Sequence, residues 1–196
     1  MLQHILKDYK VILASRSQRR QQLLSELKID FEVCADHEVD EIYPSGLGKE
    51  EIPVFLAEKK AKSVMPVVPE KTILITADTI VWLNGKVIHK PGNPDEARNM
   101  LYELSGSMHE VITGVCISLS GSRHSFYCST LVWFTDLSEE EINEYVREHN
   151  PYDKAGAYGI QEWIGYIGIE RIEGSYFNVV GLPVQRLYKE LKRILL

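Results

Sequence analysis

The stretch Lys10-Val-Ile-Leu-Ala-Ser-Arg-Ser-Gln-Arg-Arg20 decides the fold class, because it predicts a buried strand that leads directly into a helix. Lys10 to Ala14 is short and apolar, as is typical of a buried strand. Ser17 is a suitable N-cap for a helix from Gln18 to about Lys28, because its side chain can accept a hydrogen bond from the first turn. The leucines expected to face the core are Leu23, Leu24 and Leu27.

Further strands and helices interleave along the chain. The expected strands are 31–34, 72–76, 110–119, 125–134, 164–170 and 172–180, and the expected helices are 50–65, 94–105, 138–149 and 183–195. A hairpin over 80–88 turns at Asn84-Gly85, a strong two-residue turn signal. Segments 36–49 and 151–161 are expected to be loops. Because hairpins interrupt the strand–helix alternation, we expect an α/β fold with a mixed central sheet flanked by helices.

Length and charge limit the possible functions. The chain has 196 residues, and no stretch is rich enough in Pro, Gly or Ser to be a linker, so we expect one domain over 1–196. The net charge of −6 disfavours nucleic-acid binding, which usually needs a basic face. An acidic chain can still bind polyphosphate if it gathers a local cluster of positive charge.

The cysteines and the apolar segments suggest a cytoplasmic protein without a membrane partner. Cys34, Cys116 and Cys128 are odd in number and widely spaced, so we expect free thiols rather than disulfides or a structural zinc site. No apolar segment reaches membrane-spanning length, and residues 1–10 lack the apolar core of a signal peptide.

A first cluster of functional candidates lies at the predicted start of the helix at Gln18. Arg19 and Arg20 fall in a first turn where the helix dipole prefers acids. The pair is explained if an anion binds there, with backbone N–H groups, the Ser15 and Ser17 hydroxyls and two guanidinium groups converging on phosphate oxygens. A solvated basic helix end with a serine cap remains an equal alternative on these residues alone.

A second cluster follows the predicted strand 72–76. Asp78 is expected where this strand ends, at Ala77-Asp78-Thr79, and could bind a divalent metal or activate a water molecule. Lys60 and Lys90 could supply positive charge to phosphate, and Glu41 could be a second metal ligand. Each residue alone has a simpler interpretation, as a turn residue or a solvated charge, and only their joint occurrence favours a site.

A third candidate is the glycine-rich segment from Asp153 to Gln161, Asp-Lys-Ala-Gly-Ala-Tyr-Gly-Ile-Gln. Gly156 and Gly159 would allow a ligand to approach the backbone closely. The Gln161 amide carries both donors and an acceptor, so it can read the edge of a nucleobase. A tight structural loop with Gln161 on the surface is the alternative.

Taken in order, these motifs resemble the Maf family from about Ile12 to Leu187. The residues that carry the resemblance are Ser15–Arg20, Ala77-Asp78-Thr79, Lys90-Pro91, Leu104-Ser105-Gly106 with His109, Val111 and Thr113-Gly114, Asp153–Gln161, Gly174-Ser175-Tyr176 and Val179–Pro183. The family resemblance implies a fold like that of inosine triphosphate pyrophosphatases, with an active-site cleft between two lobes. It also implies cleavage of nucleoside triphosphates to the monophosphate and pyrophosphate with Mg²⁺ or Mn²⁺, and a possible homodimer.

The resemblance also assigns roles to residues. Asp78 would be the proton acceptor, and Arg19, Thr79 and Gln161 match the specificity positions of the branch that prefers dTTP and UTP. The other substrate and metal positions fall on Ser17, Arg20, Glu41, Lys60 and Lys90.

One residue departs from the family pattern, and one rival function stays open. Gln18 stands where the family usually has proline, which changes the rigidity of the loop more than the expected activity. The rival is a nucleotide-binding regulator of septum formation without turnover. The presence of both Asp78 and Lys90 counts against it, because a pure binder needs no base beside the phosphates.

Overall fold

The computed structural model describes residues 2–35, 39–64 and 71–196, so residues 36–38 of the expected loop and residue 65 of the expected helix lie outside it. The strands form one mixed sheet in the order β2-β1-β3-β5-β6-β7, and β4 pairs with β3. The chain divides into two compact units. Unit 1 comprises 1–78, 113–128 and 181–196, and unit 2 comprises 79–112 and 129–180.

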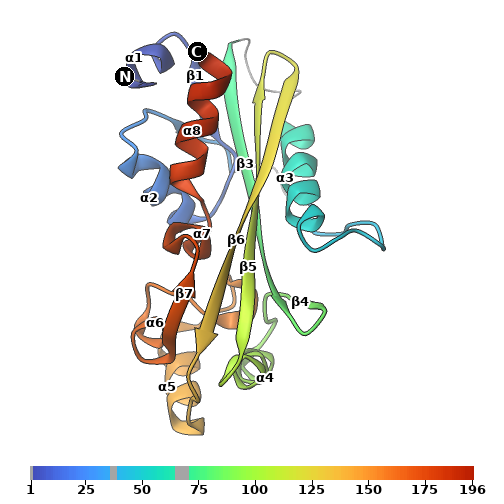
Figure 1. Ribbon diagram of the computed structural model, residues 1–196, viewed down its shortest axis with the longest axis vertical. Helices are drawn as coiled ribbons and strands as arrows, with labels where there is room; N and C mark the ends of the chain where they lie inside the picture. The colour runs from blue at the N-terminus through green and yellow to red at the C-terminus, as the bar shows by residue number, and fades with distance from the viewer. Residues whose placement is uncertain (1, 36–38, 65–70) are drawn as a thin grey trace. The chain divides into compact units, whose positions relative to one another are not determined.

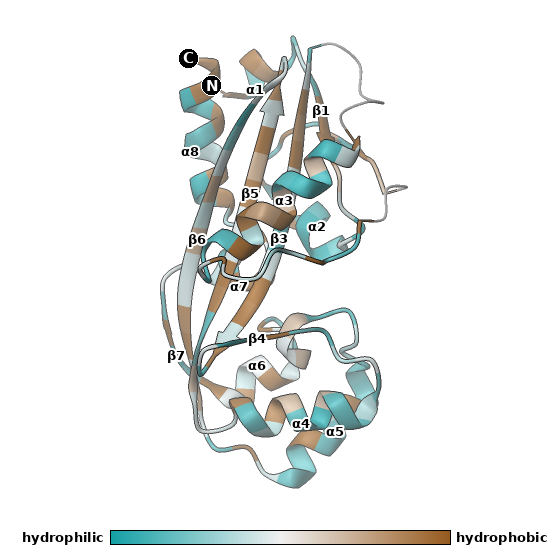
Figure 2. Ribbon diagram, turned by 90° about the vertical axis from the view of Figure 1, so that its right-hand side faces the viewer, coloured by the Kyte–Doolittle hydropathy of each residue, from teal (hydrophilic) through white to brown (hydrophobic). Residues whose placement is uncertain are grey.

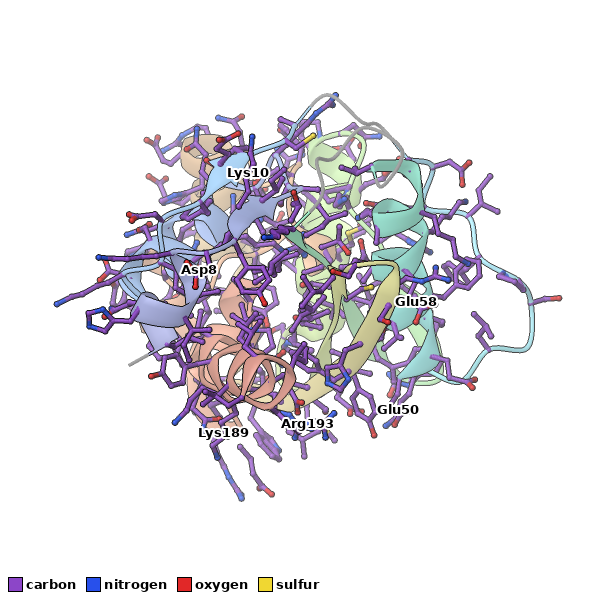
Figure 3. All side chains as sticks on the ribbon, turned by 90° about the horizontal axis from the view of Figure 1, so that it is seen from above. Asp8, Lys10, Glu50, Glu58, Lys189 and Arg193 are labelled. Atoms are coloured by element: carbon purple, nitrogen blue, oxygen red, sulfur yellow. The ribbon has the colours of Figure 1, made fainter. Side chains whose placement is uncertain are left out.

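Unit 1 is built on parallel strands that helices cover on both faces. β1 (Lys10–Leu13) pairs in parallel with β2 (Glu32–Val33) and with the first residues of β3 (Thr72–Leu83). α3 lies on one face of these strands, and α2 and α8 lie on the other (Figure 1; from above in Figure 3). The helices of this unit are α1 (Leu2–Leu6), α2 (Gln18–Glu26), α3 (Glu51–Val64) and α8 (Val184–Leu195).

The core of unit 1 lies between α3 and the sheet. Ile12, Leu74 and Cys116 face inward from β1, β3 and β5 (Met108–Leu119), and they pack against Ala57 and Ala61 of α3. β3 and β5 are accordingly largely brown in Figure 2. Small alanines on α3 allow this helix to approach the sheet closely.

Gly114 marks the closest approach between β5 and α3. A Cβ atom there would lie 2.3 Å from the backbone carbon of Pro53 and 2.3 Å from the nitrogen of Val54. Both atoms belong to the helix backbone, so no side chain can move aside to make room. Close packing of α3 on β5 therefore requires glycine at position 114.

We expect Gly114→Ala to destabilise the protein by about 1–3 kcal/mol, the usual range for overpacking a core. Urea unfolding followed by circular dichroism measures this change. The control is Gly92→Ala, whose new methyl group would meet only the end of the exposed Glu96 side chain in the first turn of α4, and no backbone atom. Equal stability of the two variants would contradict the close packing of α3 on β5.

Unit 2 combines antiparallel pairing with a cluster of short helices. The turn between β3 and β4 (Lys86–Ile88) has Asn84 at φ 49° and Gly85 at φ 83°, which confirms the predicted two-residue hairpin. β6 (Ser122–Phe134) pairs antiparallel with β7 (Ile169–Glu173). The helices are α4 (Pro94–Leu104), α5 (Glu139–His149), the 3₁₀ turn η2 (Ala155–Ala157), α6 (Trp163–Gly168) and α7 (Tyr176–Val180).

The starts of α4 and α5 follow from local sequence. Asn93 caps α4 by accepting a hydrogen bond from the Glu96 backbone, and Ser138 forms a full capping box with Glu141. α4 packs against both α5 and η2. Leu101, Leu104, Ile142 and Tyr145 are buried in the shared core of these elements.

Two expectations about local structure were wrong. β3 does not end at Ala77-Asp78-Thr79 but continues to Leu83, because Val81 to Leu83 pair with β4 after the pairing with β1 has ended at Ile75.

The second concerns 164–180, where two strands were expected and the structure has α6, β7 and α7. A Cβ on Gly165 would lie 1.9 Å from the Ile160 carbonyl oxygen, so α6 folds tightly onto the preceding loop. The Asn178 amide donates to Val111 O and to Thr130 Oγ1 and stabilises α7. These tertiary contacts override the strand propensity of the β-branched residues.

Other expectations about composition can be compared with the structure. All three cysteines are free thiols, with Cys116 buried in β5 and Cys34 and Cys128 partly buried. Among the described residues, no helix has the length and apolar character needed to cross a membrane. The short helix α1 was not expected from the sequence.

Candidate functional site

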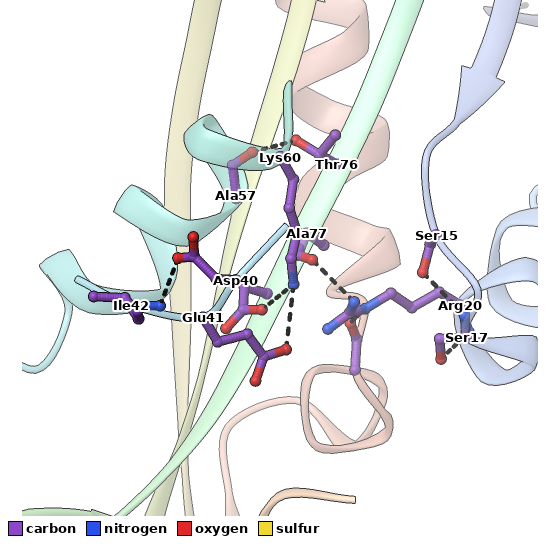
Figure 4. A network of polar contacts seen from close by, with 12 residues as sticks. Ser15, Ser17, Arg20, Asp40, Glu41, Ile42, Ala57, Lys60, Thr76 and Ala77 are labelled. Carbon is purple, nitrogen blue, oxygen red and sulfur yellow. Dashed lines mark hydrogen bonds and ion pairs between the residues drawn. The ribbon is translucent and has the colours of Figure 1, made fainter. Parts of the chain in front are cut away.

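The central feature of unit 1 is a lysine that lies between two carboxylates (Figure 4). Lys60 Nζ forms an ion pair and hydrogen bond with Asp78 Oδ1, and it lies 3.7 Å from Glu41 Oε1. Asp78 is buried, with 5% of its surface exposed. A buried carboxylate needs such a partner, because an isolated charge is costly to remove from water. The structure thus brings together three of the residues that the sequence singled out.

Contacts on both sides of α3 position Lys60. Thr76 Oγ1 in β3 donates to Ala57 O at 2.7 Å, which fixes the helix against the strand one turn before Lys60. On the outer side, Lys59 pairs with Asp40 and donates to Ile42 O at 3.0 Å. Adjacent lysines on α3 therefore bind adjacent acids of the 39–49 loop, and this pairing places Glu41 beside Lys60.

Asp78 lies in the middle of β3, beyond the point where the neighbouring strand β1 ends. The parallel pairing of β1 with β3 ends at Leu13 and Ile75. After Leu13 the chain leaves the sheet toward α2, so the stretch of β3 beyond Ile75 no longer has this neighbour. Ligands of α/β proteins usually bind at the carboxyl ends of parallel strands. The strand that ends beside Asp78 is β1, whereas β3 continues past it.

The loop from Ser15 to Arg20 has the predicted shape. Ser17 N donates to Ser15 Oγ at 3.2 Å, and Ser17 Oγ accepts from Arg20 N, so Ser17 is the N-cap of α2. Gln18 is the first residue of α2, so the helix begins where expected without the proline usual in the family. Each serine hydroxyl accepts a backbone hydrogen bond and carries one hydrogen that it can donate.

Arg20 has a role that the sequence did not suggest. Its Nε donates to Gly181 O at 2.8 Å, and its Nη1 donates to Ala77 O at 2.9 Å. Burial lowers the pKa of Arg20, while the Asp78 charge acts in the opposite direction. Arg20 therefore joins α2 to the residue before Asp78 and to the segment before α8. Phosphate binding by Arg19 and Arg20 stays a prediction.

The remaining candidates belong to unit 2. Thr79 follows Asp78 in β3, Lys90 is an exposed residue after β4, and Gln161 lies between η2 and α6. Gln161 Oε1 is buried and has no hydrogen-bond partner among the residues that the structure describes. An unpaired buried acceptor is costly in a folded protein, and a bound donor would remove this cost. The joining of these residues with those of unit 1 into one cleft stays a prediction.

The segment from Asp153 to Gln161 is fixed by contacts that single-sequence reasoning missed. Tyr145 in α5 and Glu162 at the start of α6 are 17 positions apart in the chain, yet they are hydrogen-bonded. Gly156 N donates to His89 O at 3.1 Å, which links the segment to the residue before Lys90. No local pattern joins these positions. The only indication in the sequence was the pair Gly156 and Gly159, which predicted close packing but not the residues that pack against them.

His109 anchors the same segment through Tyr158. Its Nε2 lies 2.7 Å from the Tyr158 hydroxyl, and both rings pack edge-to-face against Phe134. Within the described part of the chain, His109 Nδ1 has no hydrogen-bond partner. Burial lowers the pKa of His109 to about 4, so the neutral imidazole is the form that the folded protein accommodates.

This burial predicts a loss of stability in mild acid. The unfolded chain binds the His109 proton with a pKa near 6.5, and the folded protein with a pKa of about 4. The stabilisation by neutral His109 is therefore complete above pH 6.5 and is lost as the pH falls toward 4. At about 1.4 kcal/mol per pKa unit, the loss is about 3 kcal/mol.

Urea unfolding between pH 7 and pH 4 measures this loss. His109→Gln should have a flatter dependence of unfolding free energy on pH than the wild type, and exposed His4→Gln should follow the wild type. Parallel curves for the wild type and His109→Gln would contradict a neutral buried His109.

The oxygen ligands present are compatible with a hard divalent cation. No group of three metal-ligating side chains occurs among residues 2–35, 39–64 and 71–196. Asp78 and Glu41 nevertheless both contact Lys60, so two carboxylates already converge on one positive charge. Mg²⁺ typically binds through one or two carboxylates, with water and substrate phosphates as its other ligands. This pair fits that description.

Comparison with known proteins places the chain in a family. The model for Maf-like proteins matches residues 10–194. The chain belongs to the Maf family. A relative from Phocaeicola vulgatus named dTTP/UTP pyrophosphatase is 54% identical over 96% of this chain and 98% of its own length. Relatives with the same name from Porphyromonas gingivalis (52% identical, 95% of each chain) and Flavobacterium johnsoniae (47% identical, 97% and 98%) also match.

A solved structure is also similar to the chain. It is a nucleoside-triphosphatase / dITP/XTP pyrophosphatase from Mycobacterium abscessus that covers 94% of this chain and 96% of its own, with a TM-score of 0.42 and 12% identity. At this distance it carries no argument about fold or function.

Proposed function

We propose that this Maf-family protein hydrolyses dTTP and UTP to the nucleoside monophosphate and pyrophosphate. The observation that carries the proposal is the Lys60–Asp78–Glu41 cluster, with Arg20 bound to the backbone beside Asp78. The names of relatives at 47–54% identity over nearly the whole chain support this substrate class.

In this proposal, Asp78 accepts a proton from a water molecule whose oxygen attacks the α-phosphorus. The bond from the α-phosphorus to the bridging oxygen breaks, and pyrophosphate leaves. Lys60, Lys90 and the arginines at the start of α2 offset the negative charge that grows on the phosphate oxygens. Ser15 and Ser17 donate hydroxyl hydrogens to the same phosphates.

The metal is part of the same proposal. Asp78 and Glu41 would hold Mg²⁺ or Mn²⁺, which when bound neutralises phosphate charge in the way hard cations do. Lys60 contacts both carboxylates, so it holds them together before the substrate arrives.

Base selection is assigned to Gln161, with Thr79 and Arg19 as further specificity residues. The unpaired Oε1 of Gln161 requires a donor, and N3 of thymine and uracil carries a hydrogen. In this pose Gln161 Oε1 accepts from N3–H and the amide N–H donates to O4 of thymine or uracil. Cytosine has a bare N3 and an N4 amino group in these places, so both contacts would be mismatched, which is costly in a buried site. The preference for dTTP and UTP over dCTP follows from this chemistry.

The expected setting completes the proposal. The net charge of −6 supports a small nucleotide as the partner rather than a nucleic acid. A cytoplasmic location, the lack of a membrane partner and a homodimer are included as expectations from the sequence and the family.

The test is hydrolysis of dTTP, UTP, dCTP, ATP and 7-methyl-GTP with Mg²⁺, with pyrophosphate and orthophosphate measured separately. We expect pyrophosphate from dTTP and UTP above all. Asp78→Asn should lower kcat by about a hundredfold or more, the usual contribution of a general base. Exposed Asp30→Asn should match the wild type. Orthophosphate as the first product, full activity of Asp78→Asn, or dTTP binding without turnover would contradict the proposal.

A further inference from the structure

Glu162 directly follows Gln161 and is bound from two separate elements of unit 2. Its Oε2 accepts a hydrogen bond from the hydroxyl of Tyr145 in α5, and its Oε1 lies 3.1 Å from Lys154 Nζ. Lys154 also donates to Asp153 Oδ1 at 2.8 Å. One carboxylate thus ties together α5, the residue before η2 and the start of α6.

Tyr145 and Lys154, the two groups that contact this carboxylate, are both buried. Their polar atoms therefore need Glu162 as a partner in the folded protein. Tyr145 is 0% exposed and Lys154 is 8% exposed. A buried ammonium is tolerated only when it is paired and hydrogen-bonded. Burial, together with the Glu162 charge, raises the pKa of Tyr145. Its hydroxyl therefore remains a donor to Glu162.

The same network holds the loop on the other side of Gln161. Gly159 N donates to Tyr145 Oη at 3.0 Å, and Glu162 N donates to Gly159 O at 2.9 Å. A Cβ atom at Gly159 would lie 2.7 Å from the carboxyl carbon of Glu162, so the glycine lies directly against the carboxylate. Ile160 and Gln161 are therefore enclosed between two residues that share the Tyr145 hydroxyl.

We propose that Glu162, held by Tyr145 and Lys154, is a positioning residue that directs the Gln161 amide and thereby sets the discrimination between nucleobases. The inference rests on the proposed function, in which Gln161 reads the base. Hydrogen-bond readout requires the reading group to be held within about 0.5 Å, and residues that lock its backbone provide this precision. Glu162 acts in this role through the Gln161 backbone rather than on the reacting atoms.

Two variants test the proposal with little change in shape. Glu162→Gln keeps one acceptor oxygen and removes the charge that pairs with Lys154, and Tyr145→Phe removes only the hydroxyl. Each is compared with Glu148→Gln, which alters a solvent-exposed glutamate of α5 paired with Arg147. Thermal unfolding of all three is measured first, and kcat and KM for dTTP and dCTP are measured below the unfolding range.

We expect KM for dTTP to rise about tenfold in both variants, the equivalent of one hydrogen bond, with kcat within about a factor of two. The preference for dTTP over dCTP should fall by a similar factor, and Glu148→Gln should match the wild type. A purely structural role would lower the melting temperature and leave the substrate preference of the folded enzyme unchanged.

The outcomes separate the two proposals. An unchanged preference and KM in a folded variant would overturn the role of Glu162 while leaving the pyrophosphatase assignment intact. A wild-type protein that turns over neither dTTP nor UTP would overturn the proposed function and the positioning role with it.

Discussion

The ion pair between Lys60 and the buried Asp78 is the constraint on which the rest of the candidate site depends. A carboxylate in the middle of a buried strand must be paired, and Lys60 can reach it only if α3 lies close to the sheet. Gly114, Ala57 and Ala61 permit that approach, and the bond from Thr76 to Ala57 fixes it. The close packing of α3 on the sheet is therefore also what brings Lys60 to Asp78 in unit 1.

Much of the fold could be predicted because local chemistry determines it. The caps at Ser17, Asn93 and Ser138 and the turn at Asn84-Gly85 act through neighbouring backbone groups, and each was found where expected. The failures lie where distant contacts decide. The continuation of β3 depends on pairing with β4, and α6 and α7 depend on Ile160, Val111 and Thr130.

The candidate site divides in the same way. Asp78 could be selected because it follows a predicted buried strand, and Lys60 and Glu41 because they match the family resemblance; the structure brings the three together. The backbone bonds of Arg20 and the pairing of Tyr145 with Glu162 could not be predicted, because each joins residues on separate elements. Such supporting contacts are chemically ordinary and become visible only in three dimensions.

In the proposed reaction, a water molecule deprotonated by Asp78 attacks the α-phosphorus. A single turnover of dTTP in ¹⁸O-labelled water, with ³¹P NMR of the products, tests it most directly. We predict one ¹⁸O atom in the nucleoside monophosphate and none in the pyrophosphate. Label in the pyrophosphate would place the attack on the β-phosphorus, and no label in either product after one turnover would mean that a protein oxygen attacks first. Either result would contradict attack of water on the α-phosphorus.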